Sequence, residues 1–380
     1  MSQKPKKKDL LTSRRTLLKS AGLGGAALLL GCGNGEEASS EGDQGVARTP
    51  RTLKMVTTWP KNFPGVGTGA ERLAERVDDL SEGLIKIKVY AAGELVPALS
   101  VFDAVSEGKA DMYHGAEYYW QGKSKAFNFF AAVPFGMTAA ELNAWIYFDG
   151  GQALWDELAA GFNVKPFMGG NTGVQMGGWF RSEINTLDDL KGLRIRIPGL
   201  GGEVYRRLGA TPVTKAGGEI FLALSQGNID AAEWIGPWND LAFGFQEIAK
   251  YYYTGIHEPG TCLSLGLNLD LWNSFSDWEK TIFRNAANAE NNVMKAEYDA
   301  NNARALTALI NDHGVKLRTF SDEILLAMKR VALEVLEEIA AEDELTGRVY
   351  ESYKASLART SYWSEISEHS YARARGLGNV

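Results

Sequence analysis

The segment FDAVSEGKAD at residues 102–111 recurs in altered form as FLALSQGNID at residues 221–230. In both copies an amphipathic run, typical of a helix, ends at a glycine and is followed by a short strand pattern. Glycine is common just after a helix because it adopts the left-handed backbone conformation of that position without steric cost. The repeat therefore predicts a helix–glycine–strand unit that occurs twice in the chain.

Similar patterns precede the two copies. In each case a strand, a helix and a second strand come before the repeated segment, so two βαβαβ units are expected. Such units form α/β lobes with parallel-type sheets, and ligands bind in the crevice at the carboxyl ends of the strands. The matching elements are strands at residues 53–57 and 193–197, helices opening near residues 68 and 202, and strands at residues 85–89 and 211–214.

Two capping boxes mark expected helix starts. Thr68 with Glu71 opens the helix of the first unit, and Ser276 with Glu279 opens a helical pattern that continues to Asp312. At 1.5 Å per residue the later helix is about 50 Å long, which is enough to bridge two lobes.

The C-terminal region, residues 321–380, is predicted to be helical. Ser321 begins this region after a short strand at residues 315–320, and more helix follows toward Arg375. An apolar stripe at helical spacing should pack against the lobes. The stripe consists of Leu325, Met328, Val331, Leu333 and Leu336.

The N-terminus has the features of an export signal. A basic segment with Arg14 and Arg15 precedes an apolar run of about a dozen residues, which is too short to span a bilayer. The segment resembles a twin-arginine (Tat) signal with Leu17 at a position that usually holds Phe, and Leu29–Cys32 resembles a bacterial lipobox. We expect residues 1–31 to be the signal, Cys32 to carry a lipid, and residues 32–50 to be a flexible tether.

Charge and cysteine content exclude several classes of function. The formal net charge is −7, and residues 1–31 carry seven basic and one acidic side chain, so the remaining chain is about −13. Such a charge argues against nucleic acid as a partner. If Cys32 is lipidated, Cys262 is the one remaining cysteine, which excludes an internal disulfide and a thiolate metal cluster. Membrane contact is then expected through the lipid anchor only.

Arg196 is a candidate ligand for an anion. In the strand at residues 193–197 it alternates with apolar residues and lies at the carboxyl end, where a crevice opens. A guanidinium there can hold a carboxylate through two parallel hydrogen bonds, although arginines on strands are more often surface residues. We assign Arg194 to the surface.

Glu233 and Glu258 are candidate metal ligands. Two carboxylates that face a bound carboxylate would repel it, and a cation between them removes the conflict. Oxygen donors suit Na⁺ or Ca²⁺, while the lack of a Cys or His cluster disfavours zinc. The alternative role for either glutamate is a structural ion pair. We assign the two histidines His114 and His257 to hydrogen-bonding or loop roles.

Four segments in this order resemble one protein family. They are residues 170–175 (GNTGVQ), 193–198 (LRIRIP), 231–234 (AAEW) and 257–260 (HEPG). Over residues 50–370 the chain is similar to the substrate-binding proteins of tripartite ATP-independent periplasmic (TRAP) transporters, in the branch that binds small 2-oxo acids with a metal ion. The resemblance implies a two-lobed, type II-like periplasmic-binding-protein fold, with lobes bridged by a long helix and an extended C-terminal helical tail.

The resemblance also implies boundaries and partners. Residues 51–170 would form mainly lobe I and residues 171–257 mainly lobe II. Residues 258–320 would form a return strand and the lobe-spanning helix. Lobe closure would capture a small carboxylate, which the membrane permease subunits then receive. The family includes dimers that exchange a C-terminal helix, so residues 321–380 either form a homodimer or pack on their own lobe.

The same resemblance assigns roles to particular residues. Arg196 would bind the solute carboxylate. The ion ligands would be Gln175, Glu233, the Trp234 carbonyl and Glu258, with Asn171 as a neighbouring alternative to Gln175.

Aromatic side chains would complete the binding site. A hydroxyl of Tyr118 or Tyr119 could reach the oxo or hydroxyl oxygen of the solute, and Phe135 and Trp234 would form apolar walls. The solute could be pyruvate, a longer 2-oxo acid, lactate, a dicarboxylate or a sugar acid.

A metal-dependent lyase or hydrolase that uses Glu233 and Glu258 is the alternative function. The sequence has no nucleophile elbow, phosphate-binding glycine loop or HExxH motif, which favours a binding protein without catalysis.

Overall fold

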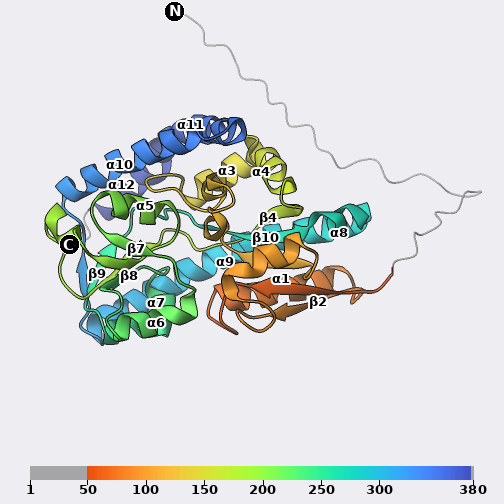
Figure 1. Cartoon of the computed structure of the whole chain (residues 1–380), viewed down its shortest axis with the longest axis horizontal. Helices are drawn as coiled ribbons and strands as arrows, with labels where there is room; N and C mark the ends of the chain where they lie inside the picture. The colour runs from red at the N-terminus through yellow and green to blue at the C-terminus, as the bar shows by residue number, and fades with distance from the viewer. Residues whose placement is uncertain (1–48, 378–380) are drawn as a thin grey trace, which may run out of the picture. The chain divides into compact units, whose positions relative to one another are not determined.

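The computed structural model describes residues 49–377. The predicted signal, the predicted lipidation site Cys32 and most of the predicted tether lie outside these residues. Two β-sheets form the centres of two lobes, with helices packed around them (Figure 1). Within residues 49–377, no helix is both long enough and apolar enough to cross a membrane.

The first sheet has five strands in the order β2-β1-β3-β10-β4. β1 pairs in parallel with β2 and β3, whereas β10 is antiparallel to both β3 and β4. The strands are β1 (Arg51–Thr57), β2 (Ile85–Tyr90), β3 (Met112–Gly115), β4 (Val164–Asn171) and β10 (Cys262–Asn268).

The second sheet has six strands in the order β11-β9-β5-β8-β6-β7. β6 pairs in parallel with β7 and β8, and β5 is antiparallel to β8 and β9. Both sheets are therefore mixed, and the expected parallel arrangement holds within each βαβαβ unit. The strands are β5 (Met176–Phe180), β6 (Arg194–Arg196), β7 (Thr211–Val213), β8 (Ala231–Ala232), β9 (Tyr251–Thr254) and β11 (Lys316–Arg318).

The repeated segment forms the expected unit in both lobes. α2 (Val101–Ser106) leads to β3 and α6 (Gly217–Ser225) leads to β8. Gly108 and Gly227 follow these helices with φ of 73° and 71°, the left-handed conformation that the sequence predicted. The strand orders β2-β1-β3 and β7-β6-β8 are equivalent, so the two units share one topology.

An antiparallel strand joins each sheet after the chain has crossed from the other lobe. The first crossing, residues 172–175, leads from β4 to β5, and the second, residues 255–261, leads from β9 to β10. Gln175 and Glu258, two candidate site residues, lie on these crossings. The topology therefore brings candidate residues to the junction of the lobes.

The first helix, α1 (Val66–Leu80), begins two residues before the expected start. Gly65, with φ 71°, turns the chain into the helix, and no side-chain cap forms at its start. A Cβ at Gly65 would lie 2.6 Å from the Tyr298 hydroxyl oxygen of the long helix described next. Close helix packing thus fixes the start of α1, and the Thr68–Glu71 capping box was a wrong prediction.

The long helix α9 (Asp277–Asn311) confirms the second capping box. The Ser276 amide donates to Glu279 Oε2 at 2.7 Å, and the Glu279 amide donates to Ser276 Oγ at 3.3 Å. The helix has 35 residues and a length of about 52 Å at 1.5 Å per residue.

α9 bridges the two lobes. On the first lobe, Arg72 of α1 forms an ion pair with Glu290 at 2.6 Å. On the second lobe, the Tyr298 hydroxyl donates to Asn239 Oδ1 of α7 (Pro237–Phe243) at 2.6 Å.

The first two C-terminal helices follow β11 and run along the top of the view in Figure 1. α10 (Asp322–Ala340) starts at Ser321 as expected, and it buries Met328, Val331 and Leu336 of the predicted stripe, while Leu325 is half-buried. Leu333 is 52% exposed, so its assignment to the stripe was wrong. The last helices are α11 (Glu344–Ser364), a π-helical turn (Glu365–His369) and α12 (Ser370–Gly376).

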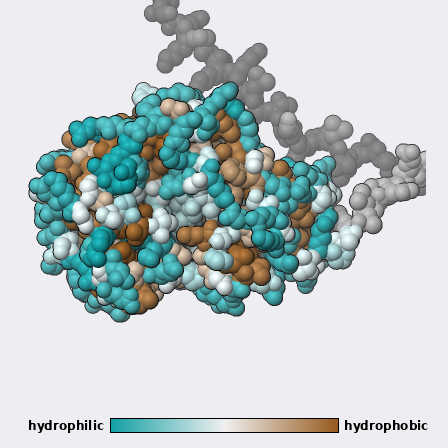
Figure 2. Space-filling view, in the orientation of Figure 1, coloured by the Kyte–Doolittle hydropathy of each residue, from teal (hydrophilic) through white to brown (hydrophobic). Residues whose placement is uncertain are grey.

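The largest apolar core is continuous between the lobes and the C-terminal helices. It includes side chains of the first lobe, of β6, of α10 and of α11, namely Phe130, Trp145, Ile195, Val335 and Tyr353. On the face shown in Figure 2, hydrophobic residues form separate patches within a mostly hydrophilic surface. The remaining helices are α3 (Ala139–Phe148), α4 (Gly151–Ala160), α5 (Gly199–Arg207) and α8 (Leu269–Ser274).

Candidate functional site

The two crossings lie side by side and are hydrogen bonded to each other. The Gln175 amide donates to the Glu258 carbonyl at 2.9 Å, and the Thr172 amide donates to the Thr261 carbonyl at 3.0 Å. A Cβ at Gly255 would lie 2.1 Å from the Gln175 carbonyl oxygen, so this close approach requires glycine. Gln175 and Glu258 are thereby held next to each other.

Arg196 lies at the end of β6 and is 1% exposed. Its Nη1 donates to the carbonyl oxygen of Glu233 at 2.6 Å and to Oε2 of the Glu233 carboxylate at 3.1 Å. Nε donates to the Lys215 carbonyl at 3.1 Å, and Nη2 lies 3.4 Å from the Tyr119 hydroxyl. The guanidinium carbon is 5.2 Å from the centre of the Trp234 ring, within range of a cation–π interaction.

Arg194 has different surroundings although it lies on the same strand. It is exposed, and its Nε donates to Asp230 Oδ2 at 2.8 Å, which is an ordinary surface ion pair.

Glu233, Glu258 and His257 form a buried cluster beside Arg196. His257 Nε2 lies 3.5 Å from Glu233 Oε1 and 3.9 Å from Glu258 Oε1. Glu258 Oε2 accepts a hydrogen bond of 2.6 Å from the Thr261 hydroxyl. Glu233 Oε1 and His257 Nε2 have no hydrogen-bond partner among the described residues.

Burial sets the charge state of this cluster. It raises the pKa of Glu258 to about 7, an effect that the negative charge of Glu233 reinforces. It also raises the pKa of Glu233 well above its usual value, against the opposing effect of Arg196, and it lowers the pKa of His257. The two carboxylates therefore lack sufficient positive charge, which a bound cation would supply.

Gln175 adds another unpartnered oxygen. Its Nε2 donates to the Thr172 hydroxyl at 3.0 Å, whereas its buried Oε1 has no partner among residues 49–377. Both polar groups of Asn171 are used by the backbone: Oδ1 accepts from the Gly173 amide and Nδ2 donates to the Gly260 carbonyl. Buried polar atoms normally have partners, so the free atoms of Gln175, Glu233 and His257 suit a ligand or cation.

The aromatic candidates lie around this polar cluster. Tyr118 and Tyr119 belong to the 3₁₀ turn η2 (Glu117–Trp120), which follows β3 of the first lobe. A Cβ at Gly199 of the second lobe would lie 3.2 Å from the Tyr118 Cβ, so the lobes are in contact here. Phe135 is half-buried, and its amide donates to the Ile256 carbonyl of the second crossing at 2.8 Å.

Trp234 packs in an aromatic cluster that the sequence did not indicate. Its ring centre is 6.2 Å from that of Trp59, which lies 6.4 Å from the ring of Tyr119. The Trp59 Nε1 donates to His114 Nδ1 at 2.7 Å, and His114 Nε2 lies 3.1 Å from the Gly169 carbonyl. His114 therefore has the hydrogen-bonding role that we expected, and it orients a tryptophan next to the site.

His257 joins the buried cluster, a position that its default assignment to a hydrogen-bonding or loop role did not predict. We assigned it to a loop role because one histidine is a weak signal for a metal site. The sequence feature that could have indicated its place in the cluster is that it directly precedes Glu258.

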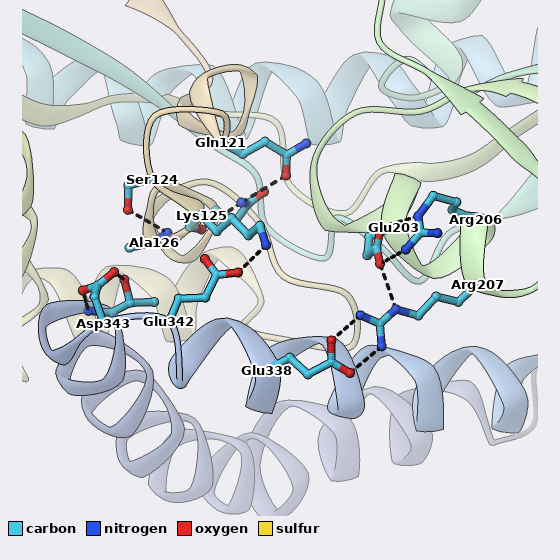
Figure 3. Close-up of polar contacts among 12 residues, drawn as sticks. Gln121, Ser124, Lys125, Ala126, Glu203, Arg206, Arg207, Glu338, Glu342 and Asp343 are labelled. Carbon is cyan, nitrogen blue, oxygen red and sulfur yellow. Dashed lines mark hydrogen bonds and ion pairs between the residues drawn. The ribbon is translucent and has the colours of Figure 1, made fainter.

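A groove of about 490 Å³ lies outside this cluster, between η2, η3 (Lys125–Phe130), α5 and α10. Its charged side chains are paired, and two of the ion pairs cross the groove, as Figure 3 shows: Lys125 with Glu342, and Arg207 with Glu338. Because these charges are satisfied, whereas those of the buried cluster are not, we place the functional site at the cluster.

Residues 55–343 match the family model described as "Bacterial extracellular solute-binding protein, family 7". A "Monocarboxylate 2-oxoacid-binding periplasmic protein" of Nostoc sp. is 45% identical over 84% of this chain and 87% of the relative. A TRAP periplasmic solute-binding protein from Pseudoalteromonas atlantica, solved with bound sodium and pyruvate, is 39% identical with a TM-score of 0.84, covering 86% of this chain and 99% of that chain. A TRAP protein from Colwellia psychrerythraea, solved with bound calcium and pyruvate, is 38% identical with a TM-score of 0.84, covering 86% and 100% of the two chains.

Proposed function

This chain belongs to the family 7 bacterial extracellular solute-binding proteins, the solute receptors of TRAP transporters, and on that basis we propose that it captures a small 2-oxo or 2-hydroxy monocarboxylate together with a metal ion. The pyruvate-bound relatives support a solute of this size. Receptors of this kind are periplasmic and deliver their solute to a membrane permease.

The observation that carries the proposal is a buried guanidinium beside unpartnered oxygens. Arg196 offers a buried positive charge, and its Nη2 faces the first lobe, 3.4 Å from the Tyr119 hydroxyl, where it can donate to a carboxylate. Gln175 Oε1 and Glu233 Oε1 are buried without partners in the described part of the chain. With a solute carboxylate present, the two glutamates and the solute carry −3 and Arg196 carries +1, so Ca²⁺ neutralises the site and Na⁺ leaves −1.

We assign the ion to Gln175, Glu233, the Trp234 carbonyl and Glu258. Side-chain and carbonyl oxygens are the donors that Na⁺ and Ca²⁺ prefer. Gln175 is favoured over Asn171 because its oxygen is free, whereas both polar groups of Asn171 are engaged. The bound ion would supply the positive charge that lets a carboxylate solute lie against two glutamates.

The first lobe completes the site by closing over the solute. Tyr118 or Tyr119 supplies a hydroxyl to the oxo or hydroxyl oxygen of the solute, and Phe135 and Trp234 supply apolar walls. The Tyr119 hydroxyl already lies 3.4 Å from Nη2 of Arg196 across the lobes. Closure around the solute would create the form that the permease subunits bind.

Calorimetric titration tests this function. Purified, metal-stripped protein is titrated with pyruvate, longer 2-oxo acids and lactate, in Na⁺, in Ca²⁺ and in chelator. We expect micromolar or tighter binding of one of these acids that disappears in chelator and low sodium. Tight binding without an ion would contradict the ion assignment, and no binding to any acid by folded protein would contradict the monocarboxylate.

Catalysis by Glu233 and Glu258, as a metal-dependent lyase or hydrolase, is the alternative. Nothing in the family match supports it, and the family is one of transport receptors. We propose that the bound acid leaves unchanged. NMR of pyruvate incubated with protein and Ca²⁺ should show no new product, and a protein-dependent product would favour the enzyme.

We further propose Tat export and lipid anchoring through Cys32. The support is the sequence pattern at residues 14–32. Cys32→Ser should move the protein from the membrane fraction to the soluble periplasmic fraction. Replacing Arg14 and Arg15 by lysines should prevent export, and unchanged fractionation of both variants would contradict this assignment.

Finally, we propose that the C-terminal helices form a homodimer. The end of α11 and the helices after it expose large apolar side chains: Tyr362 (71%), Trp363 (67%), Ile366 (53%) and Tyr371 (66%). A second copy that covers them would bury this surface. Light scattering after size exclusion should show a dimer that the double variant Trp363→Ser, Ile366→Ser converts to a monomer. Phe148→Ser, 87% exposed on α3, is the control that should remain dimeric.

A further inference from the structure

We propose that Asn239 is a positioning residue for solute capture: its side chain links the two lobes in the closed form and so raises solute affinity without contacting the solute. This inference rests on the proposed function, because it takes capture by lobe closure as given. It goes beyond that function by assigning part of the affinity to a contact outside the solute and ion site.

Asn239 lies in α7, the helix that begins directly after the site loop. This loop, residues 233–236, connects β8 to α7 and carries two of the assigned ion ligands. Asp240, the next residue along the helix, accepts hydrogen bonds from the Ile235 amide at 3.2 Å and from the Tyr252 hydroxyl at 2.7 Å. The start of α7 therefore holds the site loop, so a movement of α7 moves the loop with it.

The side chain of Asn239 connects three segments. Its Nδ2 donates to the Pro64 carbonyl at 3.0 Å, and its Oδ1 accepts from the Tyr298 hydroxyl at 2.6 Å. Pro64 lies in the first lobe, between β1 and α1, whereas Tyr298 lies on α9. A carbonyl oxygen can only accept, which fixes the orientation of the amide group. Asn239 is fully buried and both of its polar groups are engaged, so neither is available to a solute.

Phe63 adds an aromatic contact to this link. Its ring stacks on that of Phe243, at the end of α7, with the ring centres 4.3 Å apart. Its centre is also 6.2 Å from that of the Trp234 ring beside the site. Phe63 is 8% exposed, so the stack is largely removed from water. We call these contacts between the lobes the clasp: Phe63 and Pro64 of the first lobe with Asn239 and Phe243 of the second.

The clasp favours the closed form over the open form. When the lobes separate, the two phenylalanine rings part and the Asn239 amide leaves the Pro64 carbonyl. That carbonyl keeps a hydrogen bond of 2.9 Å from the Val66 amide, so it loses one of two partners. Solute is held tightly only in the closed form, and its measured affinity therefore depends on how readily the lobes close.

The test measures pyruvate binding by Asn239→Ala and by Phe63→Leu. Asn239→Ala removes the hydrogen bond between the lobes, and its pyruvate affinity in saturating Ca²⁺ should fall about fivefold. Phe63→Leu removes the stack but keeps an apolar side chain near Trp234, and its affinity should fall about three- to tenfold. Asn228→Ala and Phe221→Leu make the same chemical changes at exposed positions of the second lobe, and both should stay within about twofold of wild type.

The rate of solute release separates a positioning role from a merely structural one. Because solute enters the open form, the association rate constant should be unchanged, and the dissociation rate constant should rise by the same factor as Kd. A structural defect would instead lower the number of binding sites. Stopped-flow fluorescence of the tryptophans beside the site measures both rate constants, and calorimetry gives the stoichiometry.

A wild-type release rate in either variant, once shown to be folded, would overturn the inference. An affinity loss that appears only as fewer sites or as slower association would also overturn it. Phe63→Leu leaves the buried amide in place, so it carries the test even where Asn239→Ala does not fold. In all these cases wild type still binds pyruvate, whereas wild type that binds none of the monocarboxylates would instead overturn the proposed function.

Discussion

Arg194 and Arg196 lie two positions apart on β6, and their different burial gives them different partners. Arg194 is exposed and pairs with Asp230, whereas Arg196 is 1% exposed and contacts Glu233 and Tyr119. A charge removed from water has to be satisfied by specific partners, so the buried arginine is tied to the site and the exposed one is not.

Arg196→Ala should therefore abolish tight solute binding. Truncating one partner of a buried, hydrogen-bonded charge pair typically costs 2–5 kcal/mol or more, so pyruvate affinity should fall at least about 30-fold. Arg194→Ala is the matched control on the same strand and should stay within about threefold of wild type, because exposed ion pairs contribute little. Calorimetry on both variants, with circular dichroism to verify folding, checks this prediction. Equal losses would show that Arg196 has no direct role.

The buried carboxyl group of Glu117 should make the stability of the protein depend on pH. It is fully buried and accepts a 2.8 Å hydrogen bond from the Tyr113 hydroxyl. Burial raises its pKa to about 7 from the usual 4.5. The folded chain thus holds this proton more tightly than the unfolded chain does. The resulting stabilisation is complete below about pH 4.5 and is lost as pH rises through about 7.

Glu117→Gln should remove this pH dependence. Relative to wild type, the variant's free energy of unfolding should increase by about 3 kcal/mol between pH 4.5 and pH 7.5, since one pKa unit corresponds to about 1.4 kcal/mol. Urea unfolding at several pH values measures the difference. Glu107→Gln, at an exposed glutamate, is the control. If the free energy of unfolding changed with pH in the same way in wild type and in Glu117→Gln, the prediction would be contradicted.

At the residue scale, the sequence predicted the position of a residue best where the end of an element or a family motif marks it. Arg196, Glu233 and Glu258 were predicted from strand ends and from a family resemblance, and the structure brings them together. His257 and the Trp59–His114 pair were missed because their neighbours come from distant segments. No local pattern encodes such contacts.

At the element scale, the two capping boxes had opposite outcomes. Ser276 and Glu279 open α9 as expected, and each bonds the backbone amide of the other. Thr68 and Glu71 lie inside α1, since Gly65 packs against Tyr298 and the helix starts at Val66. A capping signal is local, and tertiary packing can override it.

Leu336 and Leu333 on α10 allow a direct test of the observed packing. Leu336 is 6% exposed and Leu333 is 52% exposed. Leu336→Ala should lower the free energy of unfolding by about 2–5 kcal/mol through lost burial and a cavity. Leu333→Ala makes the same chemical change on the same helix and should cost less than about 1 kcal/mol. Urea unfolding of both variants measures the difference, and similar costs would contradict the orientation of α10.

At the scale of the whole molecule, several connections hold the lobes around one site. The two crossings carry Gln175 and Glu258, and α9 contacts both lobes. α10 and the turn after it add ion pairs to each side of the groove in Figure 3: Glu338 of α10 pairs with Arg207 of α5, and Glu342 of the turn pairs with Lys125 of η3. The sequence predicted the two lobes from its repeat, but these long-range contacts depend on how the lobes meet.

The burial of the site implies that the lobes must open for a solute to enter. Arg196, Glu233 and His257 are each 2% exposed or less, and the Tyr119 hydroxyl of the first lobe faces Arg196 of the second. A solute can stabilise the closed form only through contacts that the open form lacks, and a carboxylate held by Arg196 while it touches Tyr119 makes such contacts.

Small-angle X-ray scattering should therefore show a smaller radius of gyration when pyruvate and Ca²⁺ are added to solute-free protein. Arg196→Ala should show no decrease at the same concentrations because it does not bind. Tyr119→Phe removes only the hydroxyl that spans the lobes, so it should weaken binding by about 1 kcal/mol, or about fivefold, and still close at saturation. If wild type had the same radius with and without solute, capture by hinge closure would be wrong. The solute would then have to enter a site that is already closed.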